Sequence, residues 1–320
     1  MPARAGSLLA ATRRGDRVAL ARLLSVVEAG GDAARAALTD LPVTVADGSW
    51  TVGITGAPGA GKSTLTNHLV AHLRQADERV AVLAIDPTSP FTGGAILGDR
   101  VRMQRHDTDP DVFIRSMATR GHLGGLTRAA PQAVRVLAAA GYGWVVVETV
   151  GVGQVEVEIA GAADTTVVVV NPGWGDGVQA AKAGLLEIGD VFAVNKADRD
   201  GVDATVHDLR SMLSLAGHRA WDPPIIETVA TEDRGVAELL EALGAHRRHL
   251  EASGELAQRR EQRIADELRA LVLDRLAKRA DDVCSGERFA TVVRDVADGA
   301  SDPYTAATFL SEGADFRGES

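Results

Sequence analysis

The segment at residues 56–64 constrains the fold of this chain more than any other part of the sequence. An apolar, β-branched run at 50–55 precedes it, and leucines at 65, 69 and 73 follow it with helical spacing. It consists of Gly56, Ala57, Pro58, Gly59, Ala60, Gly61, Lys62, Ser63 and Thr64. This is the P-loop pattern, with the strand before it and the helix after it that the motif requires, which a chance glycine-rich turn would lack. The sequence therefore predicts an α/β fold with a nucleoside triphosphate site.

The residue types of this loop suit phosphate binding. Glycines let successive backbone N–H groups point into one concavity, and the N-terminus of the following helix adds positive potential. In such a loop Lys62 reaches the β- and γ-phosphates, and the Ser63 hydroxyl ligates Mg²⁺.

Composition excludes several other classes of protein. The chain has 320 residues and a formal net charge of −10, which argues against a nucleic-acid surface. Its single cysteine, Cys284, excludes an intrachain disulfide framework and fits a reducing compartment. No apolar run approaches the roughly 20 residues of a membrane helix, and the N-terminus has no secretory pattern. We expect a cytoplasmic protein that binds neither nucleic acid nor membrane.

Strands and helices alternate from about residue 48 to residue 250, which predicts a mostly parallel sheet flanked by helices. Several of the runs are apolar throughout, as expected for strands that are covered on both faces. The predicted strands are 50–55, 80–85, 112–116, 144–148, 165–170, 191–195 and 225–229.

Helical patterns occupy both ends of the chain. Leucines and valines between residues 8 and 41 mark short helices that break near Gly15 and at 30–31. Charged helices are expected at 255–279 and 287–296, with Pro303 opening a last one. The first of these carries an apolar stripe of Leu256, Ile264, Leu268, Leu271, Val272 and Leu276. We therefore divide the chain into an N-terminal helical arm (1–47), a nucleotide domain (48–250) and a C-terminal helical arm (251–320).

A second motif indicates which base is bound. Asn195, Lys196 and Asp198 form N-K-x-D directly after a predicted core strand, and downstream of a P-loop this pattern reads guanine. The carboxylate accepts bonds from guanine N1 and N2, whereas adenine would leave it unpaired. The loop after the last core strand, Val229, Ala230 and Thr231, is expected to present a backbone N–H to guanine O6.

Three carboxylates are candidate partners of a Mg²⁺ ion. Asp86 and Glu148 end predicted strands, and Asp99 lies beyond a loop that begins at Asp86. Oxygen ligands suit this ion, whose remaining ligands would be phosphate oxygen and water. As structural alternatives, Asp86 could form a turn before Pro87, and Asp99 could cap the next helix.

The segment at 148–154 departs from the switch of Ras-like GTPases. Val152 stands where those proteins have a glutamine that orients water, and Gln154 follows two residues later. Slow intrinsic hydrolysis, open to stimulation by a partner, is expected. Gln154 either orients the attacking water or faces a protein surface. Arg115, Arg120 and His122 belong to another polar segment, around the end of the predicted strand 112–116, which could meet nucleotide or partner.

Taken in order, the P-loop and the segments 86–99, 148–154 and 195–198 resemble the MeaB/ArgK-type GTPases, the chaperones of adenosylcobalamin-dependent methylmalonyl-CoA mutase. The resemblance extends to 115–121, to 171–173 and to 302–304, and so covers nearly the whole chain.

The resemblance implies a homodimeric P-loop GTPase that uses GTP/GDP and Mg²⁺, binds a B12-dependent acyl-CoA mutase, gates its cofactor loading and protects it from inactivation. It places Ser63, Asp86, Asp99 and Glu148 around Mg²⁺, assigns guanine recognition to Asp198 and makes 171–182 a further switch loop. Lys62, Asp99, Glu148 and Gln154 are the catalytic candidates. The alternatives are a nickel-delivery GTPase of related fold, which usually carries Cys or His clusters, and a P-loop kinase or transport ATPase.

Overall fold

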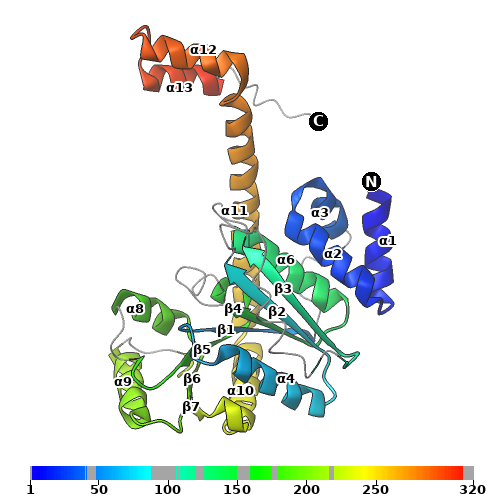
Figure 1. Ribbon diagram of the computed structural model, residues 1–320, viewed down its shortest axis with the longest axis vertical. Coiled ribbons are helices and arrows are strands. Elements are labelled where there is room, and N and C mark those ends of the chain that lie inside the picture. The colour runs from blue at the N-terminus through cyan, green and yellow to red at the C-terminus, as the bar shows by residue number, and fades with distance from the viewer. Residues whose placement is uncertain are drawn as a thin grey trace. The chain divides into compact units, whose positions relative to one another are not determined.

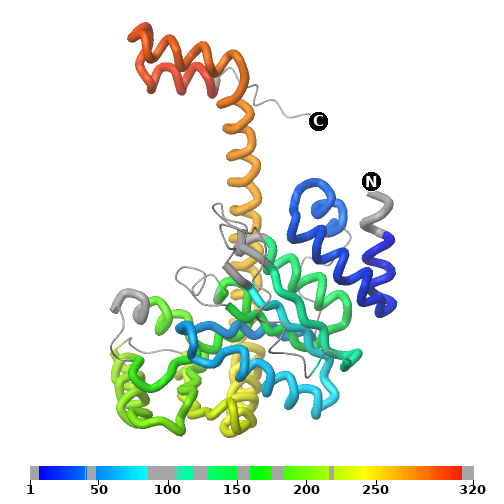
Figure 2. The backbone as a smooth tube through the Cα atoms, viewed as in Figure 1, coloured from blue at the N-terminus to red at the C-terminus, as the bar shows by residue number. Residues whose placement is uncertain are grey.

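The computed structural model describes residues 2–39, 41, 48–87, 106, 108–119, 125–149, 159–174, 179–215 and 220–312. The chain forms two compact units, Met1–Ile264 and Ala265–Ser320. Figures 1 and 2 follow the chain through both units, which are described separately below.

The first unit is built on a parallel sheet of seven strands. Their order is β3-β2-β4-β1-β5-β6-β7, and every pair of neighbours is parallel. The strands are β1 (Trp50–Thr55), β2 (Val80–Pro87), β3 (Val112–Thr119), β4 (Trp144–Thr149), β5 (Thr165–Val170), β6 (Val191–Asn195) and β7 (Ile225–Thr228). The predicted sheet is confirmed. Because all the strands run the same way, the loops that carry the motifs gather at their carboxyl ends.

Helices cover both faces of this sheet (Figure 1). They are α1 (Pro2–Arg13), α2 (Arg17–Ala29), α3 (Gly31–Leu38), α4 (Lys62–Gln75), α6 (Gly125–Ala139), α8 (Gln179–Ile188), α9 (Val202–Leu215) and α10 (Val236–Ser253), with short 3₁₀ turns η2 (Ala160–Ala162) and η4 (Ala230–Glu232). The helix α11 (Glu255–Val283) begins in this unit.

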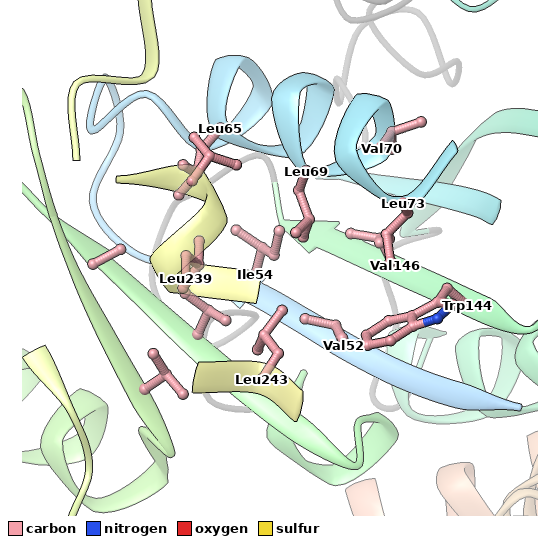
Figure 3. Packing of buried hydrophobic residues seen from close by; sticks show 14 of the residues in the cluster. Val52, Ile54, Leu65, Leu69, Val70, Leu73, Trp144, Val146, Leu239 and Leu243 are labelled. Atoms are coloured by element: carbon pink, nitrogen blue, oxygen red, sulfur yellow. The ribbon is translucent and has the colours of Figure 1, made fainter. Parts of the chain in front are cut away.

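The core beneath the P-loop helix fixes where the phosphate loop sits. Leucines of α4 and α10 pack on alternate residues of β1 and β4, as Figure 3 shows for Leu69, Ile54 and Leu243. All three side chains are fully buried. Full burial of such a side chain stabilises the fold by about 1.5–3 kcal/mol. The strand that enters the P-loop and the helix that leaves it are therefore held by one apolar layer.

The N-terminal helices cover the opposite face beside α6. Leu20, Leu23 and Leu24 of α2 are buried in the cluster that contains α6 and strands β2 to β4. Arg115 on β3 donates to Glu28 at 2.7 Å and to the carbonyl oxygen of Ala21 at 2.9 Å. Arg115 thus holds α2 against the edge strand, a structural role that its sequence context did not reveal.

The second unit contains the end of α11, α12 (Gly286–Ala297) and α13 (Pro303–Glu312). The helix α13 begins at Pro303, as predicted, because proline suits the first helical position. Asp302 caps it by accepting from the N–H groups of Tyr304 at 2.9 Å and Thr305 at 3.1 Å. Among the described residues, no helix combines the length and the apolar character needed to cross a membrane.

Candidate nucleotide-binding site

The P-loop joins the end of β1 to the start of α4, and two of its glycines are sterically required. Gly56 has φ +130°, and a methyl group there would lie 2.0 Å from the carbonyl oxygen of Val169. Gly61 has φ +97°, and a methyl group there would lie 2.2 Å from Asn195 Nδ2. Only glycine fits both this backbone conformation and this close approach. The loop is therefore pressed against its neighbours in the conformation that lets its N–H groups converge.

Lys62 lies within the loop. Its side chain is buried, and its Nζ donates to the carbonyl oxygens of Gly56 at 2.5 Å and Ala57 at 3.1 Å. An ammonium group held in this position can approach phosphate oxygens bound by the loop, as expected from the motif.

Ser63 and Glu148 meet at the carboxyl ends of two neighbouring strands. Glu148 is paired in register with Ile54 of β1, so it reaches the first turn of α4. Ser63 Oγ donates to Glu148 Oε1 at 2.5 Å, and Glu148 is buried. A hydroxyl and a carboxylate side by side form the oxygen-only donor set that Mg²⁺ prefers. These two residues fit the ion that the sequence implied.

The other metal and catalytic candidates are described only in part. The backbone of Asp86 lies near the end of β2, in the strand that pairs with β4 through Ile85 and Thr149. This places Asp86 at the same edge of the sheet as Glu148. Asp99 and Gln154 lie outside the described residues, as does Val152.

Asn195 joins the three nucleotide motifs. Its Nδ2 donates to the P-loop carbonyl of Ala60 at 2.8 Å. Its Oδ1 accepts from the N–H of Ala230 at 3.0 Å and from Thr228 Oγ1 at 3.1 Å. The side chain is buried, so these bonds are shielded from water. One amide group thus fixes the phosphate loop relative to the loop expected to meet guanine O6.

The rest of the N-K-x-D motif forms a turn beside the P-loop. Lys196 adopts a left-handed backbone with φ +61°, and its Nζ donates to the carbonyl oxygen of Gly59 at 2.6 Å. The N–H of Ala197 donates to the carbonyl oxygen of Thr228 at 3.0 Å. Asp198 is exposed beyond this turn. Its carboxylate is therefore free of the core and accessible to a base.

The loop after β7 is a closed turn. Val229 and Arg234 exchange backbone hydrogen bonds at 3.0 and 3.3 Å. Val229 and Ala230 are buried, whereas Thr231 is exposed. The structure therefore brings this predicted segment to the same edge as the P-loop and the N-K-x-D motif.

Two histidines of α4 contact this loop, which the sequence did not reveal. Their i, i+4 spacing on the P-loop helix suggested solvated positions, but both meet the loop that follows β7. His68 Nδ1 lies 3.2 Å from Asp233 Oδ1, and His72 Nε2 lies 3.0 Å from the same oxygen. Their partner is 165 or 161 positions further along the chain, so no local pattern could have indicated it.

A second missed feature lies where α11 begins. Asp164, directly before β5, is fully buried and pairs with Arg260 at 3.1 Å and with Arg263. It also accepts from the N–H of Thr51 at 3.1 Å. Burial would raise the pKa of Asp164, but the charges of Arg263 and Arg260 outweigh it and hold that pKa below its ordinary value. The first turns of α11 are therefore tied to the sheet.

A neighbouring pair strengthens this attachment. Arg259 donates to Asp190, the residue before β6, at 3.0 Å, and Asp190 accepts from the N–H of Thr166 at 2.8 Å. Burial raises the pKa of Asp190 against the opposing charge of Arg259. Burial, together with the charge of Arg259, also lowers the pKa of the adjacent His246 to about 3, so its imidazole is neutral. Arginines of α11 thus bind the residues that directly precede β5 and β6.

A P-loop, an N-K-x-D turn and a closed loop joined by Asn195, at the carboxyl edge of a parallel sheet, define a P-loop GTPase. Residues 20–284 match the family model described as "Methylmalonyl Co-A mutase-associated GTPase MeaB". The chain belongs to this MeaB family of GTPases, as the sequence resemblance predicted.

Individual relatives agree with this assignment. A Pyrococcus abyssi protein that is named as a GTPase is 48% identical over 95% of this chain and 94% of its own length. The mouse protein named "Methylmalonic aciduria type A homolog, mitochondrial" is 36% identical over 66% of this chain and 52% of its own. The crystal structure titled "LAO/AO transport system kinase" has a TM-score of 0.70 and 28% identity, and covers 97% of both chains. Guanine nucleotide binding follows from the family.

Proposed function

We propose that this chain is a GTP-hydrolysing chaperone of an adenosylcobalamin-dependent acyl-CoA mutase, with methylmalonyl-CoA mutase as the expected client. The observation that carries the proposal is the Asn195 junction, which joins phosphate and guanine motifs in a chain of the MeaB family. In this proposal GTP hydrolysis gates cofactor loading and protects the mutase from inactivation. Such a role would place the protein in the cytoplasm with its client.

The proposed chemistry assigns a role to each site residue. Lys62 and the P-loop N–H groups hold the phosphates, and Asp198 holds guanine. Ser63, Asp86, Asp99 and Glu148 would surround Mg²⁺, which neutralises charge that develops on the transferred phosphoryl group. The contact between Ser63 and Glu148 supports this set. Gln154 remains the candidate for orienting water.

We predict that the protein binds GTP and GDP with Mg²⁺ and largely ignores ATP. Asp198→Asn should weaken GDP binding roughly 10- to 100-fold, because hydrogen bonds to a charged group contribute about 1.5–3 kcal/mol. The same variant should gain affinity for xanthosine diphosphate, since the amide presents a donor to the xanthine oxygen. Titration calorimetry with GDP and xanthosine diphosphate measures both effects, and equal affinities for ATP and GTP in the unmodified protein would contradict the assignment.

The proposed client is tested by hydrolysis. We expect slow turnover of GTP by the isolated protein and faster turnover with methylmalonyl-CoA mutase, because partner contact would order the catalytic groups. Single-turnover assays with and without the mutase measure this, and Lys62→Ala controls for contaminating activity. Hydrolysis that is fast alone and unchanged by any B12-dependent acyl-CoA mutase would refute the proposed role. A pull-down from the native cell would identify which mutase binds.

We also propose that the protein is a homodimer formed through its C-terminal helices. In the second unit α11, α12 and α13 surround an apolar cavity of about 600 Å³, lined by residues that include Leu276, Phe289 and Leu310. Leu268 is 61% exposed and Leu276 is 46% exposed on α11. A second copy of the chain would cover such a surface by two-fold pairing. Leu256, part of the predicted stripe, packs instead on the core of its own chain.

Light scattering tests this assembly. The unmodified chain should have twice the mass of a monomer at micromolar concentration. A double variant, Leu268→Glu with Leu276→Glu, should be monomeric because charges would be buried in an apolar interface. Ala277→Glu places the same charge on the other side of α11 and should leave the dimer intact. A monomeric unmodified protein would rule out the homodimer.

A further inference from the structure

The end of the loop after β7 is attached to the P-loop helix. The Asp233 carboxylate lies between His68 and His72, which are one turn apart on α4, at 3.2 and 3.0 Å from the same oxygen. The other carboxylate oxygen lies 3.2 Å from His72 Nε2. The two imidazoles are largely shielded from solvent, with 16% and 21% of their side-chain surface exposed.

We infer that His68, His72 and Asp233 are positioning residues for guanine recognition, which hold the loop after β7 at the distance from the P-loop that a guanine nucleotide requires. The inference rests on the proposed function, since it concerns the same nucleotide site. None of the three residues belongs to the P-loop or to N-K-x-D, and none needs to touch the nucleotide.

The loop is rigid enough to transmit this attachment. The backbone bonds between Val229 and Arg234 close it, and the N–H of Glu232 donates to the carbonyl oxygen of Val229 at 2.9 Å. Asp233 occupies the left-handed region with φ +58°, which turns the chain so that Arg234 can pair with Val229. A displacement of Asp233 would therefore move Ala230, whose N–H group is fixed by Asn195.

The loop is consequently held at two points by two parts of the same phosphate-binding element. Asn195 connects it to the carbonyl oxygen of Ala60 in the P-loop. The histidines connect it to α4, which begins at Lys62, directly after that loop. The P-loop, which holds the phosphates, and the loop after β7, which is expected to contact the base, are then fixed relative to each other. Without the histidines, the loop would keep its bond to Asn195 and lose the attachment of Asp233 to α4.

The test uses the full chain and three variants. The double variant His68→Ala with His72→Ala removes both imidazoles, and alanine at these positions preserves the helix because it is a good helix former. Asp233→Asn removes the charge with a residue that tolerates the left-handed backbone. Glu232→Gln, at an exposed neighbouring position, makes the same kind of change outside the contact and is the matched control.

Calorimetry with Mg²⁺ then measures the affinities of GDP, IDP and inorganic tripolyphosphate. IDP retains O6 but lacks N2, and tripolyphosphate reports on the P-loop alone. We expect the histidine variant to bind GDP and IDP roughly three- to fivefold more weakly, as for the loss of one hydrogen-bonded contact, with tripolyphosphate binding unchanged.

Each other result overturns a defined statement. Variants that match Glu232→Gln for all three ligands would refute the positioning role. Equal losses for GDP and tripolyphosphate would show general damage to α4 and also refute it. Failure of the unmodified protein to bind GDP would instead contradict the proposed function itself.

Discussion

Replacing Asp164 by alanine should lower the free energy of unfolding by about 3–5 kcal/mol, the cost of breaking a buried ion pair by removing one partner. Asp164 is fully buried, and Arg260 and Arg263 are only 17% and 15% exposed. The variant would leave both guanidinium groups without their carboxylate and the N–H of Thr51 without its acceptor. The loss of the ion pairs and the loss of the hydrogen bond both affect the place where β5 begins beside β1.

Urea denaturation followed by circular dichroism measures this effect. Glu251→Ala is the matched control, because it breaks the i, i+4 pair with Arg247 in a more exposed place. Such pairs contribute about 0.3–0.5 kcal/mol. If Asp164→Ala unfolds at the same urea concentration as Glu251→Ala, the anchor of α11 does not stabilise the fold.

The pH dependence of stability provides a second check on Asp164. Its pKa is lower in the folded chain than its ordinary value. Its contribution is therefore complete above the ordinary carboxyl pKa of about 3.9 and is lost as the pH falls through the lower, folded-state pKa. The Asp164→Ala variant should accordingly show a smaller loss of stability on acidification below about pH 4 than the unmodified chain.

The anchor also changes where the C-terminal arm should be cut. The sequence placed the boundary between the nucleotide domain and the C-terminal arm at residues 250 and 251. However, the first compact unit extends to Ile264 and includes the three arginines that pair with Asp164 and Asp190. A chain that ends at residue 250 would bury those carboxylates without the arginines that balance their charge. We propose that the separable arm begins after Ile264.

The features that sequence predicted well are local ones. Four of the seven strands, β1, β4, β5 and β6, are runs that are buried along their whole length, and each nucleotide motif is a short segment at the end of one strand. Such features depend on neighbours within a few residues, so the sequence displays them directly. The contact of Ser63 with Glu148 could be anticipated because Ser63 follows β1 and Glu148 lies near the carboxyl end of β4, so both are at the same edge of the sheet.

The features that sequence did not predict are pairs of distant residues. Arg260 and Asp164 are 96 positions apart, and Arg115 and Glu28 are 87 apart. A charged residue on a helix has many possible partners, and its ordinary interpretation is a solvated surface position. Only the packing of α11 and α2 on the sheet selects one partner. Burial then makes that pair important for stability.

Gly61→Ala should weaken GDP binding by at least about 100-fold, equivalent to roughly 2.7 kcal/mol. The added methyl group would lie 2.2 Å from Asn195 Nδ2, so the amide must move. Its movement breaks the bonds to Ala60 and Ala230 that hold the phosphate loop beside the guanine loop. Fluorescence titration with a labelled GDP measures the loss, and circular dichroism establishes that the variant is folded.

Gly59→Ala separates this clash from the strain of the backbone. Gly59 also has positive φ, +72°, but a methyl group there meets nothing within 4 Å. Its cost is limited to the left-handed conformation, about 1–2 kcal/mol. If the Asn195 junction determines affinity, Gly61→Ala must weaken GDP binding clearly more than Gly59→Ala does. Asn195→Ala must then reproduce most of the difference between the two losses. Equal losses in the two glycine variants would mean that loop conformation alone governs binding and that the junction is dispensable.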